Sequence, residues 1–198
     1  MIKMIVTALF LGSLSGYFFL TPEVKPMLDR ILLAALNLTV VIAGIDIGSN
    51  RQLIKKMMNW KTAGLMVAVP GAVTIGSVLG GMVMGKLLGL AVYDALLISV
   101  GMGWYSLSSV VIATMYNTEI GTIAFFTNFL RELSAFIFVP ILAKFTSVAC
   151  AAVGGATVMD STLPVLIKSA GMSVGIIGFI SGFILTLIIP FLLSLLLG

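Results

Sequence analysis

The feature that most constrains this chain is a succession of long apolar segments that runs from one end to the other. A membrane-spanning helix needs roughly 20 mostly apolar residues, and such stretches recur here with short polar breaks between them. Charged residues make up 9% of the 198 residues and apolar ones 60%, whereas soluble domains average about 25% charged residues. So few charges cannot cover a surface that faces water. We predict an all-α polytopic membrane protein, with residues 1–198 forming a single transmembrane transporter domain.

Two of the apolar segments are discontinuous in sequence. By length we predict about seven transmembrane segments, at residues 2–20, 27–48, 62–85, 87–116, 118–145, 147–170 and 172–197. The fourth is interrupted at 101–103 and the sixth at 154–160. Backbone freed from a helix survives in a bilayer only inside protein or beside a water-filled cavity, so paired broken helices indicate a binding site. Alternatively, the glycines only allow close helix packing. A re-entrant segment would lower the number of crossings.

The basic residues predict the orientation in the membrane. The loop at 49–61 carries four of them: Arg51, Lys55, Lys56 and Lys61. Positively charged loops face the cytoplasm, so this loop and the N-terminus beside Lys3 are predicted to be cytoplasmic. The first apolar run exceeds the roughly 7–15 residues of a signal-peptide core, so we expect a retained helix. A net charge of +4 that is concentrated in loops favours membrane topology over binding of nucleic acid.

Asp160 is the sharpest candidate for a functional residue. A charged side chain at the bilayer centre costs about 2.5–3.5 kcal/mol on insertion scales and is a functional candidate by default. Asp160 follows Gly154, Gly155 and Thr157, and Pro164 comes soon after it. This order predicts a second half-helix that begins here, with its positive N-terminal end pointing at mid-membrane. The alternative is that Asp160 only caps this half-helix.

A second polar group lies at the centre of segment 118–145. Asn128 and Glu132 are four residues apart and share a face, and Arg131 lies alongside, three residues from Asn128 and four from Thr127, so that the four residues form one polar stripe. This stripe is expected to face the interior of the bundle. Arg131 is expected to pair with another helix, and Asp160 is an available partner. The alternative is an internal salt bridge that only holds the bundle together.

Four further polar residues are candidates, and Asp46 and Glu119 are the weaker two. Ser106 and Ser108 follow the first break, where their hydroxyls could line a pathway or re-satisfy freed backbone. Asp46 closes the second segment, where exposure is the simpler explanation. Glu119 lies in the first turn of the fifth segment, where an acid complements the helix dipole. The chain has no His and one Cys, which excludes a zinc site and an intrachain disulfide, and no cofactor is expected.

Three stretches resemble a known family. Residues 101–109 (GMGWYSLSS), 124–133 (AFFTNFLREL) and 154–165 (GGATVMDSTLPV) are similar in order and spacing to motifs of the LysO-type lysine exporters. The resemblance covers the whole chain, although it is thin before Gly44. It implies export of L-lysine, and of toxic analogues such as thialysine, across the cytoplasmic membrane by exchange with protons, and no enzymatic activity. The carboxylate of the substrate would meet the half-helix at Asp160, and Asp160 or Glu132 would hold an ammonium group or a proton.

The resemblance also implies a difference, because full-length members carry an additional N-terminal block of membrane helices. A short partner chain or a second copy of this chain is therefore expected to supply helices. Three alternatives stay open: a transporter of another small charged substrate or ion, a membrane subunit that needs a partner, and an intramembrane aspartyl protease using Asp46 and Asp160. A protease would need the two carboxyl groups roughly 3 Å apart.

Overall fold

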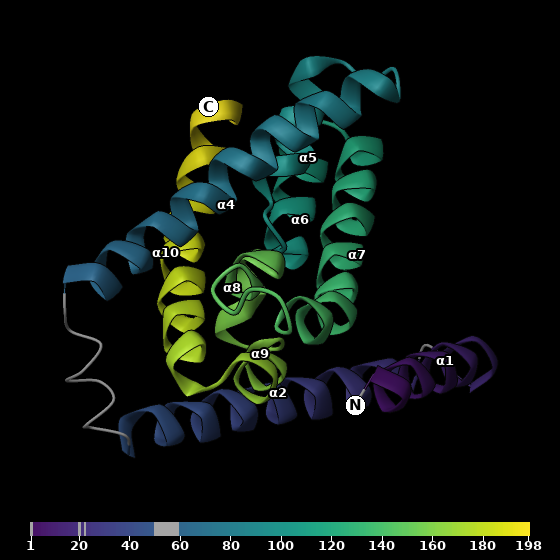
Figure 1. Ribbon diagram of the computed structural model, residues 1–198. Coiled ribbons are helices and arrows are strands. Elements are labelled where there is room, and N and C mark those ends of the chain that lie inside the picture. The colour runs from purple at the N-terminus through teal and green to yellow at the C-terminus, as the bar shows by residue number, and fades with distance from the viewer. Residues whose placement is uncertain (1, 20, 22, 50–59) are drawn as a thin grey trace.

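The computed structural model describes residues 2–19, 21, 23–49 and 60–198, and its regular structure in these ranges is helical (Figure 1). One element, η1, is a 3₁₀ helix. In chain order the elements are α1 (Ile2–Phe19), α2 (Lys25–Ser49), α4 (Trp60–Leu87), α5 (Val92–Val100), α6 (Tyr105–Met115), α7 (Thr118–Leu142), α8 (Cys150–Val153), η1 (Gly155–Met159), α9 (Leu163–Ala170) and α10 (Met172–Leu197). The predicted all-α class is confirmed, and both predicted breaks are present.

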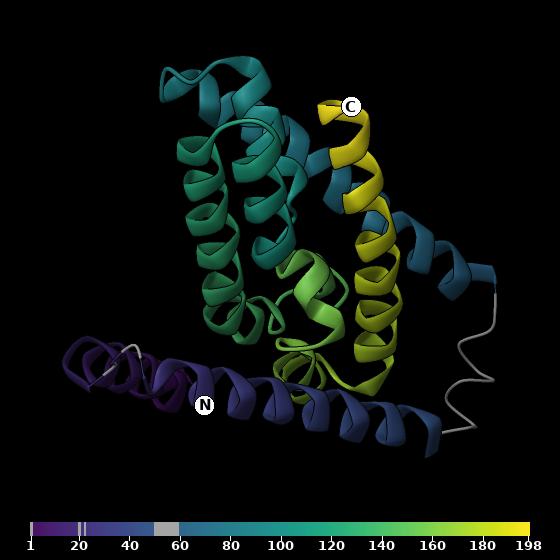
Figure 2. The same ribbon diagram turned by 180° about the vertical axis from the view of Figure 1, so that it is seen from behind.

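Three helices, α4, α7 and α10, are long and apolar enough to cross a membrane among the residues that the structure describes. They frame the bundle, and the short helices of the two broken segments, between residues 92 and 170, lie among them (Figures 1 and 2). Each continues through one proline: Pro70, Pro140 or Pro190. Neighbouring elements can re-satisfy the backbone groups that a proline frees within a membrane helix.

The fourth predicted segment folds back on itself as a hairpin of α5 and α6. Tyr93 in the first turn of α5 and Tyr116 just after α6 have ring centroids 5.3 Å apart. The Tyr116 hydroxyl also donates a hydrogen bond of 2.7 Å to Asp94. Both ends of the hairpin therefore lie at the same end of the bundle, and its break lies inside (Figure 1). The hairpin corresponds to the re-entrant alternative for this segment, which apolar length alone does not distinguish from a full crossing.

The sixth predicted segment is a second hairpin, formed by α8, η1 and α9 at the opposite end of the bundle. It starts beside the last turns of α7, where the Cys150 thiol lies 3.6 Å from the carbonyl oxygen of Val139. It then reaches the middle of α10, where a Cβ on Gly182 would lie 2.8 Å from the carbonyl oxygen of Ala156. It returns to the start of α10 at Gly171. With two hairpins in place of two crossings, the predicted count of seven is not confirmed.

Helices α1 and α2 lie across the end of the bundle at which α9 ends, and both views show them there (Figures 1 and 2). α2 contacts α9, and α1 contacts α7. The basic loop that predicted the orientation, with Arg51, Lys55 and Lys56, lies outside the described residues. The side chains of Lys3, Asp46 and Lys61 also lie outside them.

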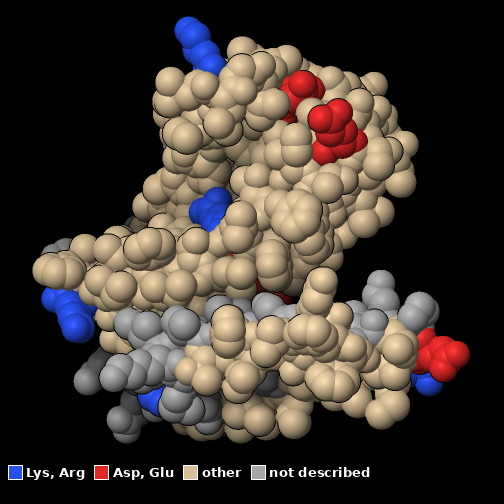
Figure 3. All heavy atoms as spheres, turned by 90° about the vertical axis from the view of Figure 1, so that its right-hand side faces the viewer, with Lys and Arg blue, Asp and Glu red and all other residues tan. Residues whose placement is uncertain are grey.

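The surface of the bundle is apolar, as the composition predicts. Figure 3 shows a face of the molecule on which basic and acidic side chains occupy only a few small patches. The exposed side chains of α4 and α10 include Val67, Leu79 and Leu187. The buried core joins both hairpins to the long helices through Leu97, Ile112, Leu166 and Leu185. A face of this kind suits contact with lipid.

Candidate transport site

The two hairpins meet backbone to backbone in the middle of the bundle. The amide of Ala156 in η1 donates a hydrogen bond of 2.9 Å to the carbonyl oxygen of Met102 between α5 and α6. Gly103, with φ of +101°, has no room for a side chain, because a Cβ there would lie 2.6 Å from the carbonyl oxygen of Gly154. The glycines at the two predicted breaks therefore permit a direct crossing of two irregular segments.

Asn128 of α7 completes the hydrogen bonding of the first break. Its amide oxygen accepts a bond of 2.7 Å from the backbone amide of Gly103. Its amide nitrogen donates to the carbonyl oxygens of Ile98 and Ala124 at 3.1 and 2.9 Å. Asn128 is 2% exposed, and an unpaired backbone group at such a buried position would cost about 1–3 kcal/mol. Its position on the interior stripe is confirmed, and its partners are backbone groups. The expectation for Thr127 was wrong, because this neighbouring residue of α7 is exposed.

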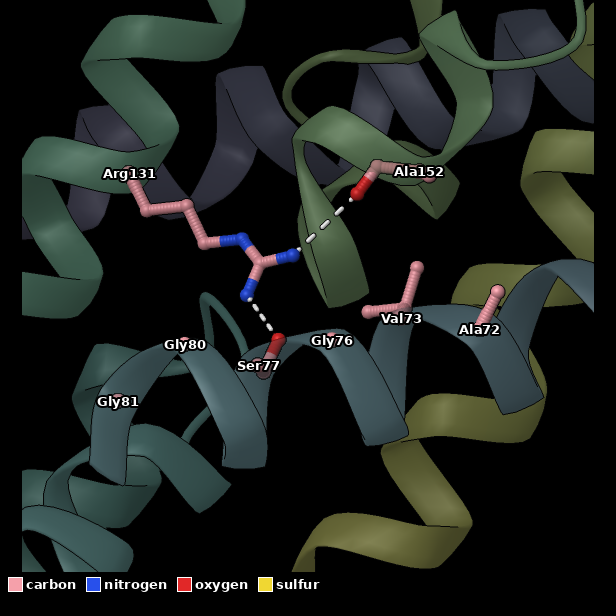
Figure 4. Close-up of a pocket in the computed structure, with 8 residues that line it drawn as sticks. All are labelled: Ala72, Val73, Gly76, Ser77, Gly80, Gly81, Arg131 and Ala152. Carbon is pink, nitrogen blue, oxygen red and sulfur yellow. Dashed lines mark hydrogen bonds between the residues drawn. The ribbon is translucent and has the colours of Figure 1, made fainter. Parts of the chain in front are cut away.

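Arg131 hydrogen-bonds to backbone groups freed at the second break, as Asn128 does at the first. Its Nε donates to the carbonyl oxygen of Val153 at 3.1 Å, and one terminal nitrogen donates to that of Ala152 at 3.2 Å. The other terminal nitrogen donates to the Ser77 hydroxyl of α4 at 2.7 Å (Figure 4). Among the described residues Arg131 makes no ion pair. Arg131 therefore contacts other helices, as expected, but the available partner Asp160 does not take part, because the freed carbonyls at the end of α8 accept from the guanidinium instead.

Glu132 and Asp160 converge on one hydroxyl group. Ser161 donates a short hydrogen bond from its Oγ to Glu132, and that same Oγ lies 3.2 Å from Oδ1 of Asp160. The backbone amide of Ser161 donates to the same Asp160 oxygen at 2.5 Å. Tyr105, the first residue of α6, lies near enough to Glu132 for the two side chains to interact electrostatically. We call Glu132, Asp160, Ser161 and Tyr105 the acidic cluster; it joins α7 to both hairpins.

The start of α9 matches the predicted half-helix, but Asp160 is not its cap. Thr162 occupies the N-cap position, Pro164 lies in the first turn and Lys168 in the last turn. No side chain among the described residues caps this end, and the Asp160 carboxylate accepts from Ser161 instead. The capping alternative therefore does not account for this carboxylate.

The remaining candidates lie apart from the acidic cluster or serve the backbone. Thr157 is buried and donates to the carbonyl oxygen of Gly154 at 3.1 Å. The Ser108 hydroxyl donates to the carbonyl oxygen of Trp104 at 2.8 Å. Of the two alternatives for this serine, a pathway lining or a bond to freed backbone, the structure therefore shows the second. Ser106 is exposed on α6. Glu119 lies in the first turn of α7 as predicted, beside the N-cap Asn117.

Sequence reasoning missed three residues of this region. Tyr105 and Ser161 lie inside the motifs that flank the breaks, so their polarity beside a break was a usable signal. Ser77 is the only side-chain partner of Arg131 among the described residues. It stands in a glycine-rich stretch of α4 that gives no sign of a charge nearby.

Two broken hairpins that enter an apolar bundle from opposite ends and meet beside charged side chains define a polytopic membrane transport protein. The sequence model of one family, described as lysine exporter LysO, matches residues 6–197. The chain therefore belongs to the LysO lysine exporter family, as its three motifs predicted.

Two curated relatives share recognisable sequence with this chain. The lysine exporter LysO of Escherichia coli strain K12 is 34% identical over 159 residues, which is 80% of this chain and 52% of the relative. A putative lysine exporter of Haemophilus influenzae is 32% identical over 154 residues, 78% of this chain and 77% of the relative. The chain thus matches about half the length of the Escherichia coli protein. No solved structure matches it.

Proposed function

We propose that this chain exports L-lysine, and analogues such as thialysine, across the cytoplasmic membrane in exchange for protons. The observation that carries the proposal is the convergence of Glu132 and Asp160 on Ser161 at the crossing of the two hairpins. Glu132 lies midway along α7 and is 8% exposed. Family membership supports lysine as the substrate, because the Escherichia coli relative is named a lysine exporter.

The acidic cluster suits an exchange of two kinds of cation. Two carboxylates that share one hydroxyl repel each other, and a bound proton or ammonium group relieves this repulsion. An ammonium group of lysine that enters the cluster would displace the proton, and a returning proton would displace the ammonium group. One carboxylate pair can couple two cations in this way because both compete for the same charge.

The proposal includes the orientation and the assembly expected from the sequence. The N-terminus lies in the cytoplasm, since the basic loop at 49–61 favours that side. Further helices, from a second copy or from a short partner chain, complete the transporter.

The direct test is exchange of radiolabelled L-lysine by the purified full chain in proteoliposomes loaded with unlabelled L-lysine. We expect exchange with the unmodified protein and its loss in Glu132→Gln, which keeps the size of the side chain and removes its charge. Glu119→Gln is the matched control, because Glu119 lies on the same helix in an exposed first turn. Equal exchange by the two variants would contradict the role of Glu132.

The same vesicles separate the proposal from its alternatives. Uptake of sodium without uptake of lysine would indicate a transporter of another cation. Absence of any uptake by the chain alone, followed by lysine exchange when a co-purifying membrane chain is added, would indicate a subunit that needs a partner. Measurement of the particle mass in nanodiscs tells a second copy from a different chain.

A further inference from the structure

A groove opens between α4, α7 and the end of α8, beside the guanidinium of Arg131 (Figure 4). Its volume is about 440 Å³, and Gly76, Ser77 and Gly80 of α4 line it together with Arg131 and Ala152. Figure 4 shows the Arg131 side chain extending from α7 toward α4, with its guanidinium above Ser77. Pockets for small ligands measure about 300–1,000 Å³, so the groove is large enough for part of an amino acid.

The glycines of α4 keep the groove open. A Cβ on Gly76 or on Gly80 would meet nothing within 4 Å. A ligand can therefore approach the backbone of α4 closely along this face. The next residue, Gly81, is different, because its Cβ would lie 2.3 Å from Cβ of Ser99 in α5. Helix packing explains Gly81, but it does not explain Gly76 and Gly80.

Arg131 brings unused hydrogen-bond donors to this groove. A guanidinium has five N–H donors, and the bonds to Ala152, Val153 and Ser77 use three of them. The other two N–H donors are unused, and the Arg131 guanidinium has no carboxylate partner among the residues described. A charge at this depth is costly unless it is paired. A carboxylate would pair with it through two parallel N–H donors, which is the geometry that Arg recognises best.

The acidic cluster cannot serve as the place for this carboxylate. The start of α9 was the expected location, but Glu132 and Asp160 already face it. A third carboxylate there would be repelled by two others. Arg131 and Glu132 are consecutive on α7 and leave it about 100° apart. A cation and an acid therefore leave consecutive positions of α7, which suits a ligand that carries both a carboxylate and ammonium groups, as lysine does.

We propose that the groove with Arg131 and Ser77 at its base is a carboxylate subsite that receives the α-carboxylate of the transported amino acid. This inference rests on the proposed function, since it assigns a second part of the same ligand. Arg131 then has two roles: it holds the end of α8 with two donors, and it offers the rest to the ligand.

The test compares two ligands that differ only in the carboxylate. Displacement of radiolabelled L-lysine from the full chain in nanodiscs is measured with unlabelled L-lysine and with 1,5-diaminopentane, which lacks the carboxylate. We expect the diamine to compete about tenfold or more weakly, the effect of one charge-assisted hydrogen-bonded contact. Ser77→Ala and Gly80→Leu should weaken the binding of lysine and leave direct binding of the diamine unchanged. The ratio of the diamine's dissociation constant to that of lysine should therefore fall toward one.

Two controls keep the result interpretable. Gly64→Leu places the same side chain on α4 outside the groove, at an exposed glycine whose Cβ would meet nothing within 4 Å, and should leave the ratio unchanged. Arg131→Ala is avoided, because it would also release the carbonyls of α8. Equal competition by diamine and lysine, or equal weakening of both ligands in Ser77→Ala and Gly80→Leu, would overturn the subsite and leave lysine transport standing. Absence of lysine binding and exchange in the unmodified protein would instead remove the proposed function.

Discussion

Gly155 lies so close to Met102 that a Cβ at position 155 would be 2.0 Å from the carbonyl oxygen of Met102. Gly155 also has φ of +68°, a conformation that side chains with a Cβ adopt only at a cost. The contact joins residues on different hairpins, so the site depends on a crossing of two backbones. A side chain at this position would push the hairpins apart and separate Tyr105 of α6 from the other members of the acidic cluster.

Gly155→Ala should therefore destabilise the protein by about 2–5 kcal/mol, the sum of a left-handed conformation and of overpacking against backbone. Gly89→Ala is the matched control. Gly89 has φ of +75° but a Cβ there would meet nothing within 4 Å, so only the conformational cost of about 1–2 kcal/mol applies. The midpoint of thermal unfolding in detergent measures both. Equal unfolding midpoints for Gly155→Ala and Gly89→Ala would show that overpacking against Met102 does not add to the loss of stability.

Asn128→Leu should destabilise the protein by about 2–4 kcal/mol, because it leaves the Gly103 amide and the Ile98 carbonyl oxygen unpaired in a buried place. Thr127→Leu provides the comparison, since Thr127 is the preceding residue of α7 and is exposed. It should change stability little. Resistance to trypsin in detergent, measured over a temperature series, would report the difference. A larger loss at position 127 than at 128 would contradict the role given to Asn128.

Ser161→Ala should slow lysine exchange by about tenfold or more, because the hydroxyl that links Glu132 to Asp160 is lost. Ser173→Ala changes an exposed serine in the first turn of α10 and should exchange lysine at the unmodified rate. Glu132→Gln combined with Asp160→Asn should be no slower than either single variant, because the two act as a unit. Additive losses in the double variant would argue for two independent sites.

The hairpins predict an accessibility pattern that full crossings would not give. In a protein with Cys150→Ala as the only other change, cysteines at Leu88 and Thr118 should react with an impermeant maleimide from the same side of the membrane. Cysteines at Ser147 and Ser173 should both react from the opposite side. All four residues are exposed. Labelling of Leu88→Cys and Thr118→Cys from different sides would contradict the hairpin and show that segment 87–116 crosses the membrane fully.

The extent of the helices was predictable because hydrophobic length and glycine breaks are local properties of a sequence. The last segment was predicted at 172–197, and α10 covers Met172–Leu197. The second half-helix was predicted from Asp160 and Pro164, and Pro164 lies in the first turn of α9. In each case the signal lies within one turn of the boundary that it predicts.

The path of the chain after each break was not predictable, because it depends on contacts between distant residues. Nothing local to 87–116 shows that Tyr116 returns to Asp94. The partner of Arg131 was missed for a related reason. A carboxylate was the expected partner for a buried cation, but the break in the helix itself supplies free carbonyl oxygens at Ala152 and Val153. A charged residue beside a broken helix therefore has two kinds of possible partner, and only the fold decides between them.

Proton movement driven by lysine tests the central claim most directly. Proteoliposomes that carry the full chain and a pH-sensitive dye inside are given L-lysine on one side only, and both the internal pH and the lysine uptake are followed. We predict that lysine entry drives protons out, that Asp160→Asn abolishes both movements, and that Asp94→Asn, a change at the outer end of α5, leaves both intact. Lysine and proton movement at the unmodified rate in Asp160→Asn would contradict the account.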